Sequence, residues 1–150
     1  IRYRGPSVAD GFFRNSNTGE AAFEAGWFYP GDFGYFDRDG FLYLTGRLKD
    51  LIIRGGINIY PKEIEEILLT HPDVADAAVV GWPSKQRGQE IAAFVVCRSD
   101  TQLTKDVLTA YCQTKIAPYK VPSEIFFLED LPKNSVGKVR KSELVPEFFS

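Results

Sequence analysis

A basic turn near the C-terminus contains the residues best suited to hold an anion. The segment Pro132-Lys-Asn-Ser-Val-Gly-Lys-Val-Arg140 carries three cations, and Lys141 adds a fourth. Gly137 permits a tight turn that presents Lys138 at its tip, where a lysine offers three donors to phosphate oxygens. The spacing is not that of a Walker phosphate loop. Considered alone, such a turn is more often a solvated basic loop.

Two charged residues earlier in the chain suit a nucleotide. The carboxylate of Asp32 can accept two hydrogen bonds from a ribose diol, or it can bond its own backbone in a turn. Arg47 can hold a ribose or a phosphate, or form a surface ion pair of small energetic weight. The single histidine, His71, precedes a proline at an expected helix end, so we interpret it as a cap and not as a catalytic base.

A pair of glycines lies between the aromatic first part of the chain and the rest. Gly55 and Gly56 follow a short apolar run, and a charged turn over residues 46–50 precedes that run. Glycine has no Cβ and tolerates positive φ, so this surface can approach a ligand closely. The alternative is an ordinary surface loop. The charged turn suits a joint between two ordered blocks.

Hydrophobic spacing and turn residues predict the elements that position these groups. Aromatic residues flank Asp39-Gly40, which predicts a β-hairpin over residues 27–45 with Asp32 in a bend of its first arm. Pro61 starts a helix with apolar residues at Ile64, Ile67 and Leu68, and His71-Pro72 ends it. The other expected elements are strands over 51–53, 74–80, 91–97 and 124–128, a polar loop from Trp82 to Glu90, a helix over 103–116 capped by Thr104, and a short terminal helix or tail over 141–148.

This mixture of strands and helices lacks regular βαβ alternation, which predicts the α+β class. We expect a small domain with a mixed or antiparallel three-stranded sheet flanked by helices, preceded by a β-hairpin-rich region. The boundary is expected near Gly46, between residues 1–45 and residues 46–150.

Composition excludes some classes of function. The chain has 150 residues and a net charge of −2, so bulk charge does not favour nucleic acid or a membrane surface, and no apolar run is long enough for a membrane span. Cys97 and Cys112 form no CxxC pair, which favours free thiols over a metal site. Free thiols fit a reducing compartment, and we expect a cytoplasmic protein. The chain lacks methionine and begins at Ile1, so we expect a piece of a longer protein.

Taken together, these segments resemble the adenylate-forming superfamily of acyl- and aryl-CoA ligases, luciferases and peptide-synthetase adenylation domains. The order and spacing match over essentially the whole chain. The matching segments are Gly26-Trp-Phe-x-x-Gly-Asp32-x-Gly-Tyr, Asp39-Gly-Phe-Leu-Tyr, Gly46-Arg-x-Lys-Asp-Leu-Ile-Ile-x-Gly-Gly-x-Asn-Ile-Tyr-Pro-x-Glu-Ile-Glu65, Asp76-Ala-Ala-Val-Val-Gly, Ala117-Pro-Tyr-Lys-Val-Pro and Leu131-Pro-Lys-x-x-x-Gly-Lys138-Val.

The resemblance implies an architecture and a two-step reaction. Residues 1–45 would end a large N-terminal domain, and residues 46–150 would form a small mobile C-terminal domain. A carboxylic acid would attack the α-phosphate of ATP, giving an acyl-adenylate and pyrophosphate. The thiol of CoA would then attack the acyl carbon and release AMP. Mg²⁺ would be held mainly by ATP and the missing N-terminal domain.

The resemblance also implies residue roles on the nucleotide side. Lys138 corresponds to the lysine that bridges the substrate carboxylate and ATP during adenylation. Asp32 corresponds to the acidic ligand of the ribose hydroxyls, and Arg47 to the arginine beside the ribose. Lys49 takes the hinge position about which the small domain turns between the two steps.

Further roles concern the thiol acceptor and the AMP phosphate. The resemblance implies that Gly55 and Gly56 face the pantetheine channel and that Asn58 contacts the AMP phosphate. Arg87 departs from the family pattern, because many CoA ligases have an aromatic residue there that stacks on the adenine. As a cation, Arg87 could still meet a CoA phosphate together with Lys85. Ile53 replaces a lysine found in some relatives.

Three functions therefore compete at this point. The chain belongs to an acyl- or aryl-CoA ligase, to an adenylation enzyme that loads a carrier-protein thiol, or to a stand-alone nucleotide- or CoA-binding module. The Asn58-Ile-Tyr-Pro61 segment favours a CoA ligase over peptide-synthetase adenylation domains. The acid that is activated is not encoded in these residues, because its pocket would lie in the missing domain.

Overall fold

A computed structural model of the chain describes residues 1–9, 11, 22–98 and 101–144. The chain divides into two compact units, Ile1–Lys49 and Asp50–Ser150. Strand pairing through Arg47 keeps Gly46 in the first unit. The functional boundary expected near Gly46 stays a prediction.

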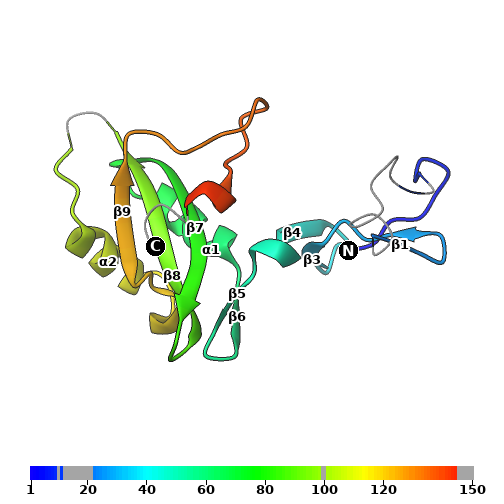
Figure 1. Cartoon of the computed structure of the whole chain (residues 1–150), viewed down its shortest axis with the longest axis horizontal. Helices are drawn as coiled ribbons and strands as arrows, with labels where there is room; N and C mark the ends of the chain where they lie inside the picture. The colour runs from blue at the N-terminus through cyan, green and yellow to red at the C-terminus, as the bar shows by residue number, and fades with distance from the viewer. Residues whose placement is uncertain (10, 12–21, 99–100, 145–150) are drawn as a thin grey trace. The chain divides into compact units, whose positions relative to one another are not determined.

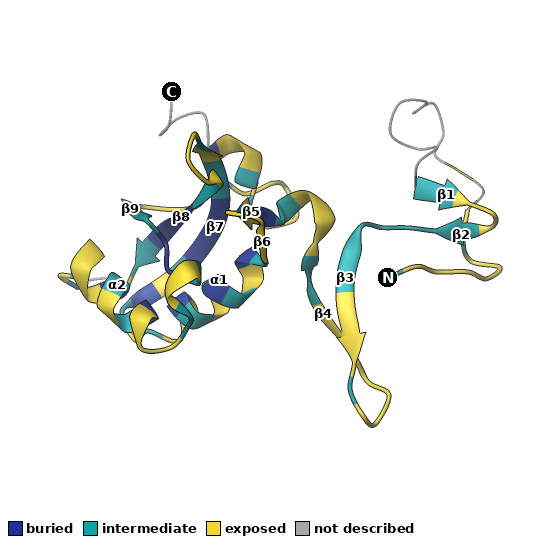
Figure 2. Cartoon of the chain, turned by 90° about the horizontal axis from the view of Figure 1, so that it is seen from below, coloured by how far each residue is buried: buried dark blue, intermediate teal, exposed yellow. Residues whose placement is uncertain are grey.

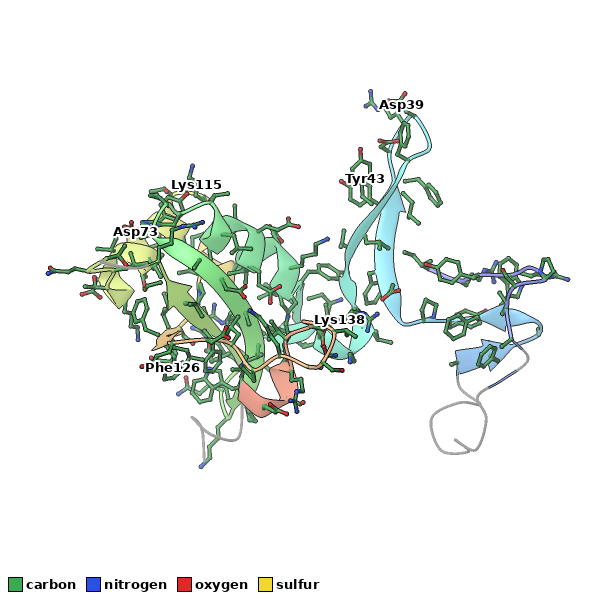
Figure 3. The ribbon with its side chains drawn as sticks, turned by 90° about the horizontal axis from the view of Figure 1, so that it is seen from above. Asp39, Tyr43, Asp73, Lys115, Phe126 and Lys138 are labelled. Carbon is green, nitrogen blue, oxygen red and sulfur yellow. The ribbon has the colours of Figure 1, made fainter. Side chains whose placement is uncertain are left out.

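The described residues of the first unit contain two antiparallel strand pairs. Strands β1 (Phe23–Glu24) and β2 (Trp27–Phe28) form the first pair. Strands β3 (Asp32–Phe36) and β4 (Leu42–Arg47) form a hairpin about the predicted Asp39-Gly40 turn, with Asp39 at its tip (Figure 3). Residues 27–28, expected in its first arm, pair with β1 instead. Asp32 is the first residue of β3, so its expected place in a bend is wrong.

The hairpin turn is closed by a carboxylate. Asp37 Oδ1 accepts hydrogen bonds from the amides of Asp39, at 3.0 Å, and Phe41, at 2.8 Å. The bond from Phe41 is the main reason why the pKa of Asp37 is lowered, because a bonded carboxylate favours its charged form. Gly40 has a φ of +85°, which suits glycine in a tight turn.

The second unit is organised around a five-stranded sheet, which confirms the α+β class. Its strands are β5 (Ile52–Arg54), β6 (Ile57–Ile59), β7 (Val74–Ser84), β8 (Gly88–Cys97) and β9 (Glu124–Leu128). Strand β8 pairs antiparallel with β7 and parallel with β9. Strands β7, β8 and β9 make up the expected three-stranded part, with β8 between the other two, and the β5–β6 hairpin, which pairs with the start of β8, brings the number of strands to five.

Both α-helices contribute apolar side chains to one core cluster on a single face of this sheet (Figure 2). Helix α1 (Pro61–Leu69) has proline at its first turn and buries Ile64 and Leu68. Helix α2 (Lys105–Gln113) begins after the predicted cap Thr104, whose hydroxyl accepts a hydrogen bond from the Val107 amide at 3.4 Å. Each helix therefore buries one apolar stripe, as the sequence spacing predicts.

The opposite face of the sheet is covered by the segment that follows β9 (Figure 1). Leu131 and Leu144 are both 2% exposed and pack with Phe94 of β8 in a second core cluster. The 3₁₀ turn η4 (Lys141–Glu143) precedes Leu144, and the rest of the expected terminal helix lies outside the described residues.

The prediction of a polar loop from Trp82 to Glu90 is wrong. Strand pairing continues through Trp82↔Glu90 and Ser84↔Gly88, so only residues 85–87 form the connection. This end of the two strands is partly exposed to solvent. Strand pairing uses only backbone groups, so the solvent-exposed side chains here can be polar. Within the described residues, no helix has the length and apolar character needed to cross a membrane.

Candidate active site

The structure brings Asp32 and Arg47 together in the first unit. They are register partners across β3 and β4, so their side chains leave neighbouring strands at the same level. Arg47 Nε lies 3.1 Å from Asp32 Oδ1, and the two side chains are 50% and 18% exposed, respectively. The pair leaves the second carboxylate oxygen and most of the guanidinium donors for other partners.

The glycines around Asp32 shape the local backbone. Gly31 has a φ of +78°, which turns the chain into β3. A Cβ on Gly34 would lie 2.5 Å from the Tyr43 carbonyl oxygen, so only glycine fits this position in the hairpin. The Gly31-Asp32-x-Gly34 pattern therefore fixes the carboxylate opposite Arg47.

Lys49 lies at the division between the two units. It is exposed in the 3₁₀ turn η2 (Leu48–Asp50), and the first unit ends with it. Short 3₁₀ turns are frequent connectors between elements. The predicted hinge role of Lys49 stays a prediction.

Gly55 and Gly56 form the two-residue turn of the β5–β6 hairpin. Their φ values are +58° and +82°, the pattern of a type I′ turn, which glycine adopts without strain. A Cβ at either position would meet no described atom within 4 Å. Backbone conformation, and not crowding within the described residues, therefore explains both glycines, and the turn presents bare backbone to its surroundings.

The structure places Arg87 beside this glycine turn. The Gly55 amide donates a 2.8 Å hydrogen bond to the Arg87 carbonyl, so the connection between β7 and β8 lies against the β5–β6 turn. The Arg87 side chain is 54% exposed, and its Nη1 lies 3.5 Å from Glu90 Oε1. Asn58 lies on β6, opposite Ile53 of β5, and is also exposed.

Lys138 lies in a tight loop after β9 (Figure 3). The side chain of Asn134 organises this loop, because its Oδ1 accepts from the amides of Val136, at 3.1 Å, and Lys138, at 2.8 Å. Gly137 has a φ of +80°, and Lys133 and Val139 form a bridge at the base of the loop. Lys138 itself is exposed.

The four cations of this basic segment have different surroundings. Lys133 lies 2.9 Å from Asp76, Lys141 lies 2.6 Å from Glu65, and Arg140 pairs with Glu143. Among the described residues, Lys138 is the member of this segment without an ion-pair partner. Its ammonium group therefore has all three donors to offer to an anionic ligand.

Arg54 and Glu90 form a further charged pair that no sequence motif indicates. Arg54 Nε lies 2.7 Å from Glu90 Oε2, and the side chains are only 11% and 15% exposed. Arg54 immediately precedes the two glycines, but nothing in the sequence indicates its partner, because Glu90 belongs to another strand. This ion pair lies next to the Gly55–Arg87 contact.

The candidate residues thus form three groups. Asp32 and Arg47 lie together in the first unit, whereas Gly55, Gly56 and Arg87 lie together in the second. Lys138 lies on a separate loop of the second unit. Described residues of the chain contain no cluster of three His, Cys, Asp or Glu side chains that would hold a metal ion.

Comparison with known proteins places this arrangement in a family. The model of the AMP-binding enzyme C-terminal domain matches residues 63–138. Oxalate–CoA ligase of Arabidopsis thaliana is 43% identical over 97% of the chain, and 2-succinylbenzoate–CoA ligase of Bacillus cereus is 45% identical over 96%. The chain spans only 28% and 30% of the lengths of these two relatives.

A solved structure agrees with these matches. o-Succinylbenzoate CoA synthetase from Bacillus subtilis, in complex with the acyl-adenylate intermediate OSB-AMP, superposes with a TM-score of 0.87 at 41% identity. The match covers 95% of this chain and 29% of that one. Sequence, fold and the order of the motifs agree, and the chain therefore belongs to the AMP-binding enzyme family, of which it contains the C-terminal domain.

Proposed function

We propose that this chain is the C-terminal part of an AMP-forming acid–thiol ligase that makes CoA thioesters. In the first step a carboxylate oxygen attacks the α-phosphorus of ATP, and pyrophosphate leaves. In the second step the sulfur of CoA attacks the acyl carbon, and AMP leaves. The observation that carries the proposal is the exposed, unpaired Lys138 beside three basic neighbours that are all paired.

The first step requires two anions to meet, and a fixed cation offsets their repulsion. Lys138 would supply this charge between the substrate carboxylate and the ATP phosphates. Asp32 and Arg47 would hold the ribose, and the oxygen of Asp32 that does not face Arg47 supports this role. Asn58 would contact the AMP phosphate. Mg²⁺ would arrive with ATP and be held mainly by the N-terminal domain.

The second step requires a surface that a thiol-bearing chain can approach. The exposed backbone at Gly55 and Gly56 suits a pantetheine arm. Arg87 and Lys85 lie in the connection beside this turn, and their charges suit the phosphates of CoA. Lys49 would be the joint about which the second unit turns between the two steps, so that the glycine turn replaces the Lys138 loop at the nucleotide.

Two observations favour CoA over a carrier-protein thiol as the acceptor. The named relatives are CoA ligases, and the basic connection over residues 85–87 matches a phosphorylated acceptor.

Both cysteines are free thiols, which supports a cytoplasmic setting. The acid is a small carboxylic acid, for which oxalate and 2-succinylbenzoate are the first candidates to test because relatives are named for them.

The test separates the two half-reactions in the full-length protein that contains this chain. Lys138→Ala should lower acid-dependent exchange of pyrophosphate into ATP by about two to three orders of magnitude, as for loss of a single charge-stabilising donor. Conversion of a supplied acyl-adenylate to acyl-CoA should stay within about twofold, because the lysine does not act in that step.

The matched control is Lys115→Ala, which removes another exposed lysine of the second unit. It should leave both half-reactions unchanged. Equal loss of both half-reactions in Lys138→Ala would contradict the role of this lysine. Absence of CoA-dependent AMP release from the unsubstituted enzyme, with thioester formed only on a carrier protein, would contradict the proposed acceptor.

A further inference from the structure

A nearly buried ion pair lies directly behind the glycine turn of the β5–β6 hairpin. Arg54 is the last residue of β5 before the turn, and its Nε lies 2.7 Å from Glu90 Oε2 on β8. The two side chains are 11% and 15% exposed. Charges this far from solvent are retained only when they are paired, so the geometry of each depends on the other.

The pair belongs to a ring of contacts that returns to the turn. The second oxygen of Glu90 lies 3.5 Å from Arg87 Nη1. The carbonyl of Arg87 accepts the amide hydrogen of Gly55 at 2.8 Å, and Gly55 is bonded to Arg54 along the chain. Glu90 therefore contacts both Arg54, which leads into the glycine turn, and Arg87, whose backbone is hydrogen-bonded to that turn.

Arg54 also connects the turn to the helical layer. Its Nη1 donates a 2.7 Å hydrogen bond to the carbonyl of Tyr119 in the 3₁₀ turn η3 (Pro118–Lys120). The next residue, Lys120, places its ammonium 2.7 Å from the carboxylate oxygens of Glu63 in helix α1. The guanidinium thus forms an ion pair with one element and a hydrogen bond with another, which the single ammonium of lysine does not reproduce with the same geometry.

The two ends of the hairpin are fixed in different ways. At the open end, Ile52 and Ile59 face each other across the strands and are buried in the core, at 1% and 0% exposure. At the turn end, a Cβ on either glycine would meet no described atom, so packing contributes little to the position of the turn. At this end, the polar contacts of Arg54 and Glu90 restrain the position of the turn in place of apolar packing.

We propose that Arg54 and Glu90 are positioning residues for the thiol-transfer step, because they hold the exposed Gly55-Gly56 backbone and the adjoining Arg87 in one fixed arrangement, over which the pantetheine arm of CoA would pass. This inference rests on the proposed function. Neither residue touches the reacting atoms. Their loss loosens the turn and slows acyl transfer to CoA, while adenylation, which depends on the Lys138 loop, continues.

The test uses the full-length enzyme with whichever carboxylic acid supports pyrophosphate exchange best. Arg54→Lys keeps the charge but loses the fork that reaches Glu90 and Tyr119 together. Glu90→Gln keeps the shape but loses the charge. The double variant Arg54→Met with Glu90→Leu replaces the pair by apolar side chains of similar size, which often preserves stability. Lys105→Met is the control, because it breaks the exposed pair with Glu124 elsewhere in the unit.

We expect acyl transfer from a supplied adenylate to CoA to fall about tenfold or more in all three Arg54 and Glu90 variants, with pyrophosphate exchange within about twofold. Amide hydrogen exchange at residues 55–57 should become about tenfold faster, while the amides of α1 stay protected. The double variant should unfold at the temperature of the unsubstituted enzyme and still show the transfer defect, which separates positioning from folding.

Two results would overturn the inference. One is an equal fall in both half-reactions, and the other is normal transfer in the double variant despite faster amide exchange at the turn. Failure of the proposed function is distinguishable, because the unsubstituted enzyme would then give no pyrophosphate exchange or no acyl-CoA before any substitution is compared.

Discussion

The two cysteines of this chain differ in their access to solvent, and their chemistry should differ accordingly. Cys112 is fully buried on α2 in the main core cluster, whereas Cys97 is half-buried at the end of β8. Burial raises the pKa of the Cys112 thiol to about 11, because the core does not solvate a thiolate. Cys112 thus serves as a small apolar side chain.

We expect a disulfide reagent at pH 8 to label Cys97 well before Cys112. The pKa of Cys112 in the folded protein lies above the ordinary value of 9.0. The protonated Cys112 thiol therefore stabilises the fold fully below pH 9, and this contribution is lost as the pH rises toward about 11. A Cys97→Ser variant should take up reagent slowly at pH 8, and rapidly once urea unfolds the second unit. Fast stoichiometric labelling of the folded Cys97→Ser variant would contradict the buried assignment.

At the scale of elements, the loop that carries Lys138 is held at its base by charged side chains. Lys133 contacts both Asp76, at 2.9 Å, and Asp130, at 3.3 Å, and the Arg140 guanidinium donates to the Lys133 carbonyl at 3.3 Å. Asp76 belongs to β7, so the loop is fastened to the edge of the sheet. This base limits where the tip can carry the Lys138 ammonium.

Lys133→Met should therefore slow pyrophosphate exchange about tenfold while leaving acyl transfer to CoA unchanged. The hydrogen bond to Asp76 is the largest cause of the raised pKa of Lys133, so the contact supports the loop fully below the ordinary pKa of 10.5 and is lost as the pH rises through the higher folded value. Lys62→Met, which breaks the exposed pair with Glu66, is the control and should keep the unsubstituted profile.

Local patterns predicted the elements better than the contacts between them. The turn at Asp39-Gly40, the Pro61 start of α1 and the Thr104 cap each depend on neighbours in the chain, and the structure contains them. The partners of Arg54, Lys133 and Lys141 belong to other elements, so spacing along the chain gave no signal for them. Gly137 and Lys138 predicted a turn with a lysine at its tip, but only tertiary contacts distinguish this lysine from its three paired neighbours.

At the scale of the whole molecule, the chain comprises two compact units that divide immediately after Lys49. The first contains Asp32 and Arg47, and the second contains both the Lys138 loop and the glycine turn. A reaction with two chemically distinct steps can use two faces of one small unit if that unit turns about the connection. The 3₁₀ turn at residues 48–50 contains no buried residue, so a change of φ and ψ there would disturb little packing.

Lys49→Pro tests this joint directly in the full-length enzyme. Proline fixes its own φ near −65° and restricts the residue before it, so the substitution should reduce the number of conformations available to η2. We expect one half-reaction to stay within a few-fold of the unsubstituted enzyme and the other to fall at least tenfold, measured separately as pyrophosphate exchange and acyl transfer to CoA. Lys49→Ala, which removes the side chain but leaves the backbone free, should change both rates little. If the proline variant retains both half-reactions at full rate, rotation about Lys49 is not part of the cycle, and the two faces of the second unit must act without it.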